Sequence, residues 1–556
     1  MLNELYTPQG ENLTGTPWQV YPRPQLKRDS YVNLNGDWAF AVGNNAFDRT
    51  IRVPFCPESA LSGIHTHFPE GRTLKYRRFV TLPEGFHRGR VLLHIGAADQ
   101  KLTCYVNSKQ IGVHEGGYEA MTFDITDALQ EENCIELSCK DDLRLTEYPY
   151  GKQTMKRGGM WYTPVSGIWQ TVWLESVPVT YIEKLDIQTD LTCARIRVIP
   201  AQPGKVILQG REYPLADGVA EICPENPRLW SPEDPYLYEF AVETEADRVE
   251  SYFALRTIES KAVDGIARLC LNGKPYFFHG LLDQGYWPDG IYTPPSPECY
   301  KNDILSMKRL GFNTLRKHIK VEPEEFYYQC DRLGMVVFQD MVNNGDYSFF
   351  RDTLLPTVGL QKRNDKNLHK NPAARKRFLD SMEATVNQLK NHPCILYWTI
   401  FNEGWGQFDS GNAYERLKKL DGSRIIDATS GWFRQEKSDV ESLHIYFNFW
   451  HRLKKADKPL VLSEFGGYTY AAEDHLFNPD KAYGYKTCKD LDAFRTQLDE
   501  LYRKRIIPAV KKGLCAAIYT QVSDVEDEIN GLLTYDRKLC KADEAAMQKL
   551  AQELRL

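Results

Sequence analysis

Residues 391–405 read Asn-His-Pro-Cys-Ile-Leu-Tyr-Trp-Thr-Ile-Phe-Asn-Glu-Gly-Trp, and this stretch decides the fold class. Between Pro393 and Gly404 lies a nearly unbroken apolar run that is rich in β-branched and aromatic residues. Such a run is typical of a parallel strand that is buried on both faces. Charge arrives only at its end, with Glu403. In a (β/α)8 barrel the carboxyl ends of the strands carry the active site, so Glu403 is a candidate catalytic group. An acid that merely begins a loop would look the same.

A second apolar run of the same design, residues 459–463, ends in Glu464 and is followed by Phe-Gly-Gly. Two acids on two buried strand ends are what glycoside hydrolysis needs. One protonates the leaving oxygen, and the other attacks the anomeric carbon or activates water. The segments Trp-Thr-Ile-Phe-Asn-Glu-Gly (398–404) and Ser-Glu-Phe-Gly (463–466) resemble the acid/base and nucleophile signatures of glycoside hydrolase family 2. That family includes β-galactosidases, β-glucuronidases and β-mannosidases.

The composition bounds the class of protein. The 556 residues allow three or four domains, and 69 basic against 75 acidic residues give a net charge of −6, which indicates neither nucleic acid nor an anionic membrane as a partner. No secretory signal or membrane-spanning run is visible, and the 13 cysteines show no zinc-site spacing. We expect reduced core thiols and a cytoplasmic enzyme, although a chain whose leader had been removed would read the same. A homo-oligomer is left open.

Three domains are expected. Residues 1–177 contain short alternating runs, such as 91–95 and 102–106, separated by turn signals that include Asn35-Gly36, which indicates an all-β sandwich. Segments 21–26, 33–38 and 166–175 resemble the sugar-binding jelly-roll domain that opens family-2 enzymes. Residues 178–262 have about the size of one immunoglobulin-like β-sandwich domain. Residues 263–556 would form the catalytic TIM barrel.

In that last region short apolar runs alternate with helical patterns, as in βα units. Segment 271–280 is expected to supply a hairpin turn and then the first strand, and the other seven strands are expected at 313–316, 335–340, 394–401, 424–429, 442–446, 459–464 and 516–521. Helices are expected at 297–310, 322–333, 373–389 and 542–554. A long polar segment, 341–371, follows the third strand, and such a segment is more often functional or mobile than idle.

The resemblance implies a retaining mechanism, with Glu464 as the nucleophile and Glu403 as the acid and later the base. Their closeness should raise the pKa of Glu403 and keep it protonated until Glu464 is esterified. By the same resemblance, Asn402 would bind the sugar 2-hydroxyl and Tyr446 would bond the nucleophile. Because no ligand cluster is recognisable among the strand ends, neither a metal ion nor an organic cofactor is expected.

Other strand ends supply further candidates for binding a carbohydrate substrate. Asp340 either binds a sugar hydroxyl or supports Arg316, and the sequence does not separate these roles. The remaining candidates lie after the first and eighth strands: Asp283, Gln284, Trp287, Tyr519 and Gln521. The acidic segment 523–531 lacks the ligand spacing of a calcium loop and is expected to be solvated.

Strand two departs from the family pattern. β-Galactosidases and β-glucuronidases typically have His-Tyr-Pro shortly after the arginine, whereas this chain has Arg316-Lys-His-Ile-Lys-Val321. The change puts Lys317, His318 and Lys320 near the rim, where they either bind a substrate carboxylate or point to solvent. The Asn-x-Lys carboxylate clamp of β-glucuronidases is absent after strand eight. We therefore expect a β-galactosidase-type enzyme, with a β-uronidase as the alternative. A non-catalytic carbohydrate-binding protein is the alternative of another class.

Overall fold

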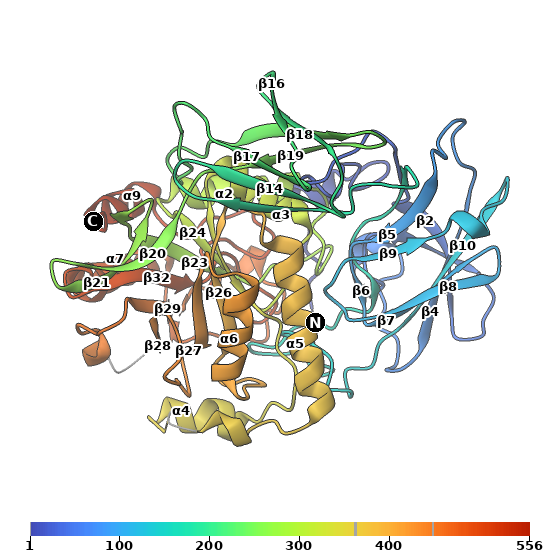
Figure 1. Cartoon of the computed structure of the whole chain (residues 1–556). Helices are drawn as coiled ribbons and strands as arrows, with labels where there is room; N and C mark the ends of the chain where they lie inside the picture. Colours follow the sequence, from blue (N-terminus) through green and yellow to red (C-terminus); the bar gives the residue numbers. More distant parts are fainter. Residues whose placement is uncertain (1, 361–363, 447–449) are drawn as a thin grey trace.

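The computed structural model describes residues 2–360, 364–446 and 450–556. It confirms a multidomain architecture of two β-sandwiches and a parallel barrel. In Figure 1 the first sandwich, blue to cyan, stands beside the barrel, while the second, green, lies across the end of the barrel near α2 and α3. The predicted domain boundaries stay predictions; the one at 262/263 falls within a hairpin of β20 (Ile258–Val263) and β21 (Ile266–Leu271).

The first sandwich packs a six-stranded sheet, in the order β3-β2-β4-β10-β7-β8, against a four-stranded sheet, β1-β12-β5-β9. The central strand β10 buries every second side chain, as expected of a strand with one face in the core. The ten strands are β1 (Tyr31–Asn33), β2 (Gly36–Val42), β3 (Arg49–Val53), β4 (Thr73–Val80), β5 (Arg90–Ile95), β7 (Lys101–Val106), β8 (Lys109–Glu115), β9 (Met121–Asp124), β10 (Asn133–Lys140) and β12 (Val172–Val177).

The second sandwich has a three-stranded sheet, β13-β14-β17, and a four-stranded sheet, β16-β15-β18-β19. Its strands are β13 (Lys184–Thr189), β14 (Ala194–Ile199), β15 (Gly204–Leu208), β16 (Arg211–Pro214), β17 (Val219–Ile222), β18 (Tyr238–Thr244) and β19 (Arg248–Phe253). Cys193 and Cys223 form a disulfide, so the expectation that all the thiols are reduced was wrong. The two residues directly flank the antiparallel pair Ala194 and Ile222, which brings them face to face. A cytoplasmic location stays a prediction.

The barrel sheet runs in the order β27-β26-β25-β24-β23-β32-β29-β28, and all its pairs are parallel. All eight predicted strands are present: β23 (Phe278–Asp283), β24 (Thr314–Lys317), β25 (Val336–Asp340), β26 (Ile395–Asn402), β27 (Ile425–Ser430), β28 (Glu441–Ile445), β29 (Leu460–Gly466) and β32 (Leu514–Thr520). The two end strands approach each other through Ser430 and Ser442, whose hydroxyl oxygens are 3.3 Å apart.

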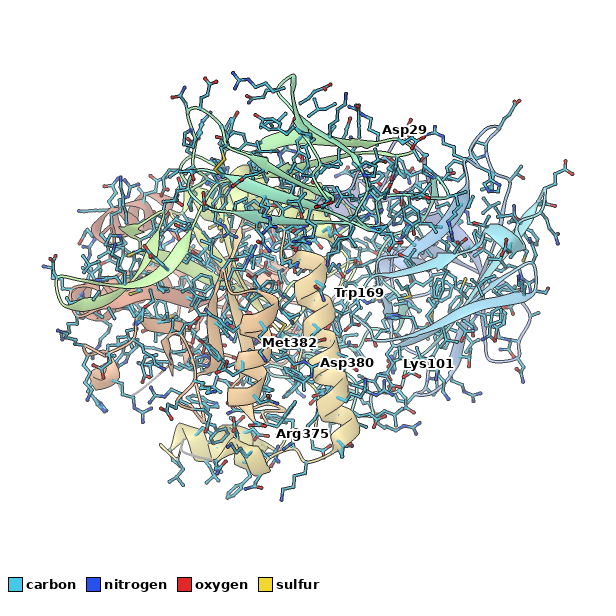
Figure 2. The ribbon with its side chains drawn as sticks, in the orientation of Figure 1. Asp29, Lys101, Trp169, Arg375, Asp380 and Met382 are labelled. Atoms are coloured by element: carbon cyan, nitrogen blue, oxygen red, sulfur yellow. A yellow bond between two sulfur atoms is a disulfide. The ribbon has the colours of Figure 1, made fainter. Side chains whose placement is uncertain are left out.

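The predicted helices are also present, as α2 (Glu298–Arg309), α3 (Glu324–Leu333), α5 (Pro372–Leu389) and α9 (Glu544–Glu553). Two more, α6 (Ser410–Leu420) and α7 (Leu491–Leu501), cover the barrel. Figure 2 shows Arg375, Asp380 and Met382 spaced along α5. The predicted long segment, 341–371, contains short helices at Phe349–Leu354, Leu355–Thr357 and Asp365–Asn367, and its residues 361–363 lie outside the described residues. No described helix has the length and apolar character needed to cross a membrane.

A loop of the first domain, residues 146–163, docks on the barrel. Its backbone bonds the loop after β25: the amide of Gly345 donates to the carbonyl of Thr146 (2.6 Å), and that of Tyr150 donates to the carbonyl of Asn343 (3.0 Å). Trp169, labelled in Figure 2, packs edge-on against Tyr292 of the barrel at 5.0 Å between ring centroids. The first domain is therefore built onto the carboxyl ends of the barrel strands.

The acidic segment 523–531 holds the same loop, and the expectation of a solvated segment was wrong. All of its residues are buried. Arg157 pairs with Asp527 at 2.8 Å and with Glu526 at 3.5 Å, and the hydroxyl of Tyr162 donates to Glu528. Asp524 pairs with Lys541 at 2.6 Å. The carboxylates are buried because each one has a partner.

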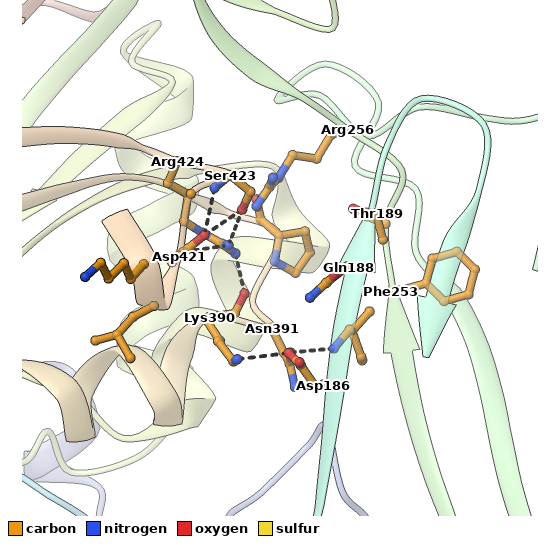
Figure 3. Close-up of a pocket in the computed structure, with 16 residues that line it drawn as sticks. Asp186, Gln188, Thr189, Phe253, Arg256, Lys390, Asn391, Asp421, Ser423 and Arg424 are labelled. Carbon is orange, nitrogen blue, oxygen red and sulfur yellow. Dashed lines mark hydrogen bonds and ion pairs between the residues drawn. The ribbon is translucent and has the colours of Figure 1, made fainter. Parts of the chain in front are cut away.

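At the opposite end of the barrel, a cavity of about 410 Å³ separates β13 from the amino ends of β26 and β27. Figure 3 shows Asp186 beside Lys390, and Asp421 beside Arg424, in its wall. Both are ion pairs of 2.9 Å. Because catalytic residues of such barrels lie at the carboxyl ends of the strands, this cavity at the amino ends is not a candidate active site.

Replacing Arg157 with Met should destabilise the docked loop, because two buried carboxylates would lose their cation. We expect the melting temperature to fall by about 5 to 10 °C, as measured by differential scanning calorimetry. The control is Arg88→Met, which breaks the exposed ion pair with Asp29 and should shift the melting temperature by no more than about 2 °C. Equal shifts for the two variants would contradict the docking role of Arg157.

Candidate active site

One buried guanidinium, that of Arg316 at the end of β24, joins the ends of four barrel strands. It donates to Asp340 (3.0 Å), Glu464 (2.9 Å), Asn402 (2.8 Å) and the backbone carbonyl of Ser463 (3.1 Å). Burial by itself lowers the pKa of Arg316, but Asp340 and Glu464 outweigh that effect and hold the pKa above its usual value. The site therefore carries a permanent positive charge at its floor.

Asp340 supports this guanidinium, which was one of the two roles considered for it. Its second oxygen lies 2.8 Å from Nδ1 of His318, so both carboxylate oxygens are engaged. Burial lowers the pKa of His318 to about 4, so the imidazole is neutral at physiological pH. Arg316, His318 and Asp340 thus form one network, and Asp340 is positioned by it.

Glu464 lies on β29 and is buried. One of its oxygens accepts from Arg316, and the other accepts from the hydroxyl of Tyr446, the contact expected of that tyrosine. Burial raises the pKa of Glu464, but His444, Arg316 and the hydrogen bond from Tyr446 outweigh it, and the pKa is lowered to about 2. The carboxylate is therefore ionised at any working pH, as a nucleophile must be.

Glu403 follows β26 directly and has a backbone φ of 51°, in the left-handed region that non-glycine residues rarely adopt. The turn is fixed by the amide of Glu403 donating to the carbonyl of Ser430 (2.9 Å) and that of Trp405 donating to the carbonyl of Asn402 (2.9 Å). Such local strain concentrates at functional sites. Here it directs the carboxyl of Glu403 toward His444, 2.7 Å away.

His444 on β28 was missed by the sequence reasoning. Its Nδ1 contacts Glu403, while its Nε2 lies 3.6 Å from Glu464 and 2.9 Å from the hydroxyl of Ser430. Ligand atoms of Glu403, His444 and Glu464 all lie within 4.8 Å of one another. A signal was available: His444 precedes Tyr446 by two residues, and alternate residues of a strand share a face.

Asn402 offers a donor to the site. Its carbonyl oxygen accepts from Arg316, which fixes the orientation of the amide. The amide nitrogen is buried and has no hydrogen-bond partner among the described residues. A substrate hydroxyl would satisfy it, because a buried donor left unpaired costs about 1 to 3 kcal/mol. This fits the role expected of Asn402.

Lys320 does not reach the sugar pocket, and neither of the two roles considered for the lysines was right. Lys317 and Lys320 are both buried, and both pair with Glu322, at 2.9 and 3.0 Å. The ammonium of Lys320 also donates to the carbonyls of Gly285 and Tyr292. Asp283 is engaged as well, because it pairs with Lys317 at 2.7 Å.

Other predicted binding residues serve packing. Trp287, a predicted substrate-binding residue, packs against Tyr300 of α2 and under the guanidinium of Arg537, 4.0 Å from its ring centroid. Tyr519 is buried behind β29, where its ring borders Phe465. These two placements correct the prediction. Gln284 and Gln521 are buried with unpaired carbonyl oxygens, and the amide of Gln521 donates to Asn530 (2.8 Å).

An aromatic wall near the turn after Glu403 is formed by Trp161, Tyr347 and Trp405. Trp161, from the docked loop of the first domain, stacks on Trp405 at 5.3 Å between ring centroids. Tyr347, from the segment after β25, meets both rings edge-on, at 4.8 and 5.7 Å. Trp405 comes two residues after Glu403, so this wall borders the candidate acid. Three separate parts of the chain supply it, which is why the sequence did not reveal it.

Curated proteins with related sequences carry two kinds of name. A β-galactosidase of Thermoanaerobacter pseudethanolicus is 24% identical over 515 residues, which cover 82% of this chain and 65% of the relative. A β-glucuronidase of Homo sapiens is 25% identical over 511 residues, which cover 78% of this chain and 74% of the relative. The chain thus spans between 65% and 74% of the length of these two relatives.

Solved structures share the whole fold. A β-glucuronidase of an uncultured Clostridium species has a TM-score of 0.74 at 18% identity, covering 96% of this chain and 100% of that chain. A family-2 β-galacturonidase from Eisenbergiella tayi, bound to galacturonate, has a TM-score of 0.70 at 17% identity, covering 97% of this chain and 98% of that chain. At such identities the likeness establishes the fold alone.

Family assignment rests on the sequence. Residues 180–256 match the description "Glycosyl hydrolases family 2", and residues 263–555 match "Glycosyl hydrolases family 2, TIM barrel domain". The second match alone covers more than half of the 556 residues. It includes the two strand ends that carry the candidate carboxyls. The chain therefore belongs to glycoside hydrolase family 2.

Proposed function

We propose that this chain is a retaining exo-β-glycosidase that releases terminal β-linked sugars. The observation that carries the proposal is the closeness of the two carboxyls: oxygens of Glu403 and Glu464 lie within 4.8 Å of each other. Retaining glycosidases keep their carboxyls about 5 to 5.5 Å apart, whereas inverting enzymes need about 6.5 to 9.5 Å to admit a water molecule. The separation of Glu403 and Glu464 therefore fits a retaining mechanism, in which a carboxylate attacks the sugar directly.

In the first step an oxygen of Glu464 attacks the anomeric carbon, the glycosidic bond breaks, and Glu403 gives its proton to the departing oxygen. In the second step Glu403 takes a proton from water, the water oxygen bonds the anomeric carbon, and Glu464 leaves as a carboxylate. Asn402 would donate to a sugar hydroxyl throughout. His444 would hold Glu403 in place through its Nδ1 contact.

The sugar is the finer question. The neutral β-galactoside, expected because the Asn-x-Lys clamp is missing, and the β-uronide alternative both have namesakes among the related proteins and structures. A non-catalytic binding protein is disfavoured, because such a protein has no need of two acids joined by a histidine. The contacts of Lys152, a residue of the first domain, favour the uronide.

The first test labels the nucleophile. A 2-fluoro glycosyl fluoride should form a stable ester with Glu464, because the fluorine slows the second step more than the departure of fluoride. Mass spectrometry of peptides would locate the label. Glu464→Gln should lower kcat by about 10⁴-fold or more. A label on any other residue would refute the assignment.

The second test separates the acid from the nucleophile. Glu403→Ala should lose far more activity on methyl or phenyl glycosides than on dinitrophenyl glycosides, because a good leaving group needs little protonation. Azide should restore turnover of the variant and yield a β-glycosyl azide, identified by NMR. A product with the α configuration would show that the mechanism is not retaining.

The third test concerns metal ions. Glu403, His444 and Glu464 could hold one by geometry, yet the mechanism uses the two carboxyls directly, so a bound metal would compete with the sugar. Dialysis against a chelator should therefore leave kcat/KM unchanged. Loss of activity that a single divalent ion restores would overturn this expectation.

A further inference from the structure

Four lysines are buried among the described residues, and three of them have carboxylate partners. The pairs are Lys317 with Asp283 and Glu322, Lys320 with Glu322, and Lys541 with Asp524. The fourth, Lys152, is 6% exposed, and it forms no ion pair with any carboxylate of the described residues. Since a buried ammonium is almost always paired, Lys152 is the exception that needs a reason.

Two aromatic rings border the ammonium of Lys152. Its Nζ lies 4.9 Å from the ring centroid of Trp405 and 5.9 Å from that of Tyr162. Contact with ring faces is favourable for a cation, but it leaves the three N–H donors without oxygen acceptors. No described residue accepts a hydrogen bond from them at ordinary distance. The ammonium is positioned, and its donors are available.

Lys152 contacts the turn that follows the candidate acid. Trp405, which it contacts, comes two residues after Glu403. The preceding Gly151 lies so close to the loop after β24 that an added Cβ would be 3.0 Å from the carbonyl oxygen of Ile319. Burial lowers the pKa of His318, and the positive charge of Lys152 lowers it further.

We propose that Lys152 binds the carboxylate of a terminal hexuronic acid, so that the enzyme prefers β-uronides to neutral β-glycosides. This inference rests on the proposed function, because the carboxylate must belong to the sugar held by Glu403 and Glu464. A hexuronide differs from the hexoside by one ionised carboxylate, and a lysine is a compact positive charge that can meet it. A neutral sugar would leave that charge uncompensated, which is how a buried site rejects an analogue.

The other candidate cations for binding a substrate carboxylate are paired within the protein. Lys317 and Lys320 are both neutralised by Glu322, and Lys317 pairs with Asp283 as well. Arg157, on the same loop as Lys152, is neutralised by Glu526 and Asp527. Among the described residues of the docked loop and of strand two, Lys152 is thus the buried cation without a carboxylate partner.

The test compares matched substrates: nitrophenyl β-glucuronide with β-glucoside, and nitrophenyl β-galacturonide with β-galactoside. Wild-type enzyme should prefer the uronide of at least one pair. Lys152→Met should lower kcat/KM on that uronide about 10- to 100-fold more than on its neutral partner, mainly through KM. Lys152→Arg, which keeps the charge, should retain part of the preference. The control is Lys156→Met, which removes an exposed charge from the same loop and should leave the ratio unaltered.

Any of four results would overturn the proposal. Wild-type activity on neutral glycosides alone would refute Lys152 as a uronate ligand and leave the proposed glycosidase standing. Equal losses on both members of a pair would make Lys152 structural. A loss confined to a carboxyphenyl galactoside would place the carboxylate on the leaving group. If no glycoside is cleaved, the proposed function itself fails. Calorimetric binding of free galacturonate and glucuronate to the wild type and to Lys152→Met then decides the role of Lys152, since unchanged affinity would refute it.

Discussion

The whole mouth of the barrel depends on satisfying one buried guanidinium. Arg316 needs acceptors for its N–H donors, and it finds them on three other strands, at Asp340, Asn402 and Glu464. Removing the cation would leave two carboxylates buried close together, a penalty of several kcal/mol. Because the guanidinium is rigid and planar, the acceptors must also stand in fixed directions. Glu464, the proposed nucleophile, is therefore positioned by the need to neutralise a charge.

A second constraint lies outside the barrel. The loop 146–163 of the first domain is held by backbone bonds to the loop after β25 and by buried carboxylates after β32. It places Trp161 against Trp405, and thus forms part of the wall of the site. The first sandwich is consequently a structural part of the candidate active site. This explains why the segment after β32 is acidic and yet buried: Glu526, Asp527 and Glu528 find their partners in a domain that is distant in the sequence, and Asp524 pairs with Lys541.

The features that the sequence predicted are those with a local signature. Buried parallel strands read as apolar runs, and an acid that directly follows such a run lies at the active face, so Glu403 and Glu464 could be placed together. The rim role of Lys320 failed because its partner Glu322 cannot be identified from spacing alone. The prediction that Trp287 binds substrate was wrong because its ring packs against Tyr300 of α2, a contact that spacing alone does not reveal. Lys152 had no signature at all, because its neighbour Trp405 is more than 250 residues away.

This division between strand ends and loops has a consequence for specificity. The charges that hold Glu464 in place are mutually compensated, so altering one of them disturbs the others. Lys152 shares none of its described contacts with Arg316, and it sits on a loop held by separate ion pairs. A change of sugar preference could therefore arise at position 152 without loss of the bond-breaking groups. Loops on a rigid scaffold are where such variation is tolerated. If Lys152 binds a uronate as proposed, this chain could change its sugar preference at that position while it keeps the barrel and both carboxyls.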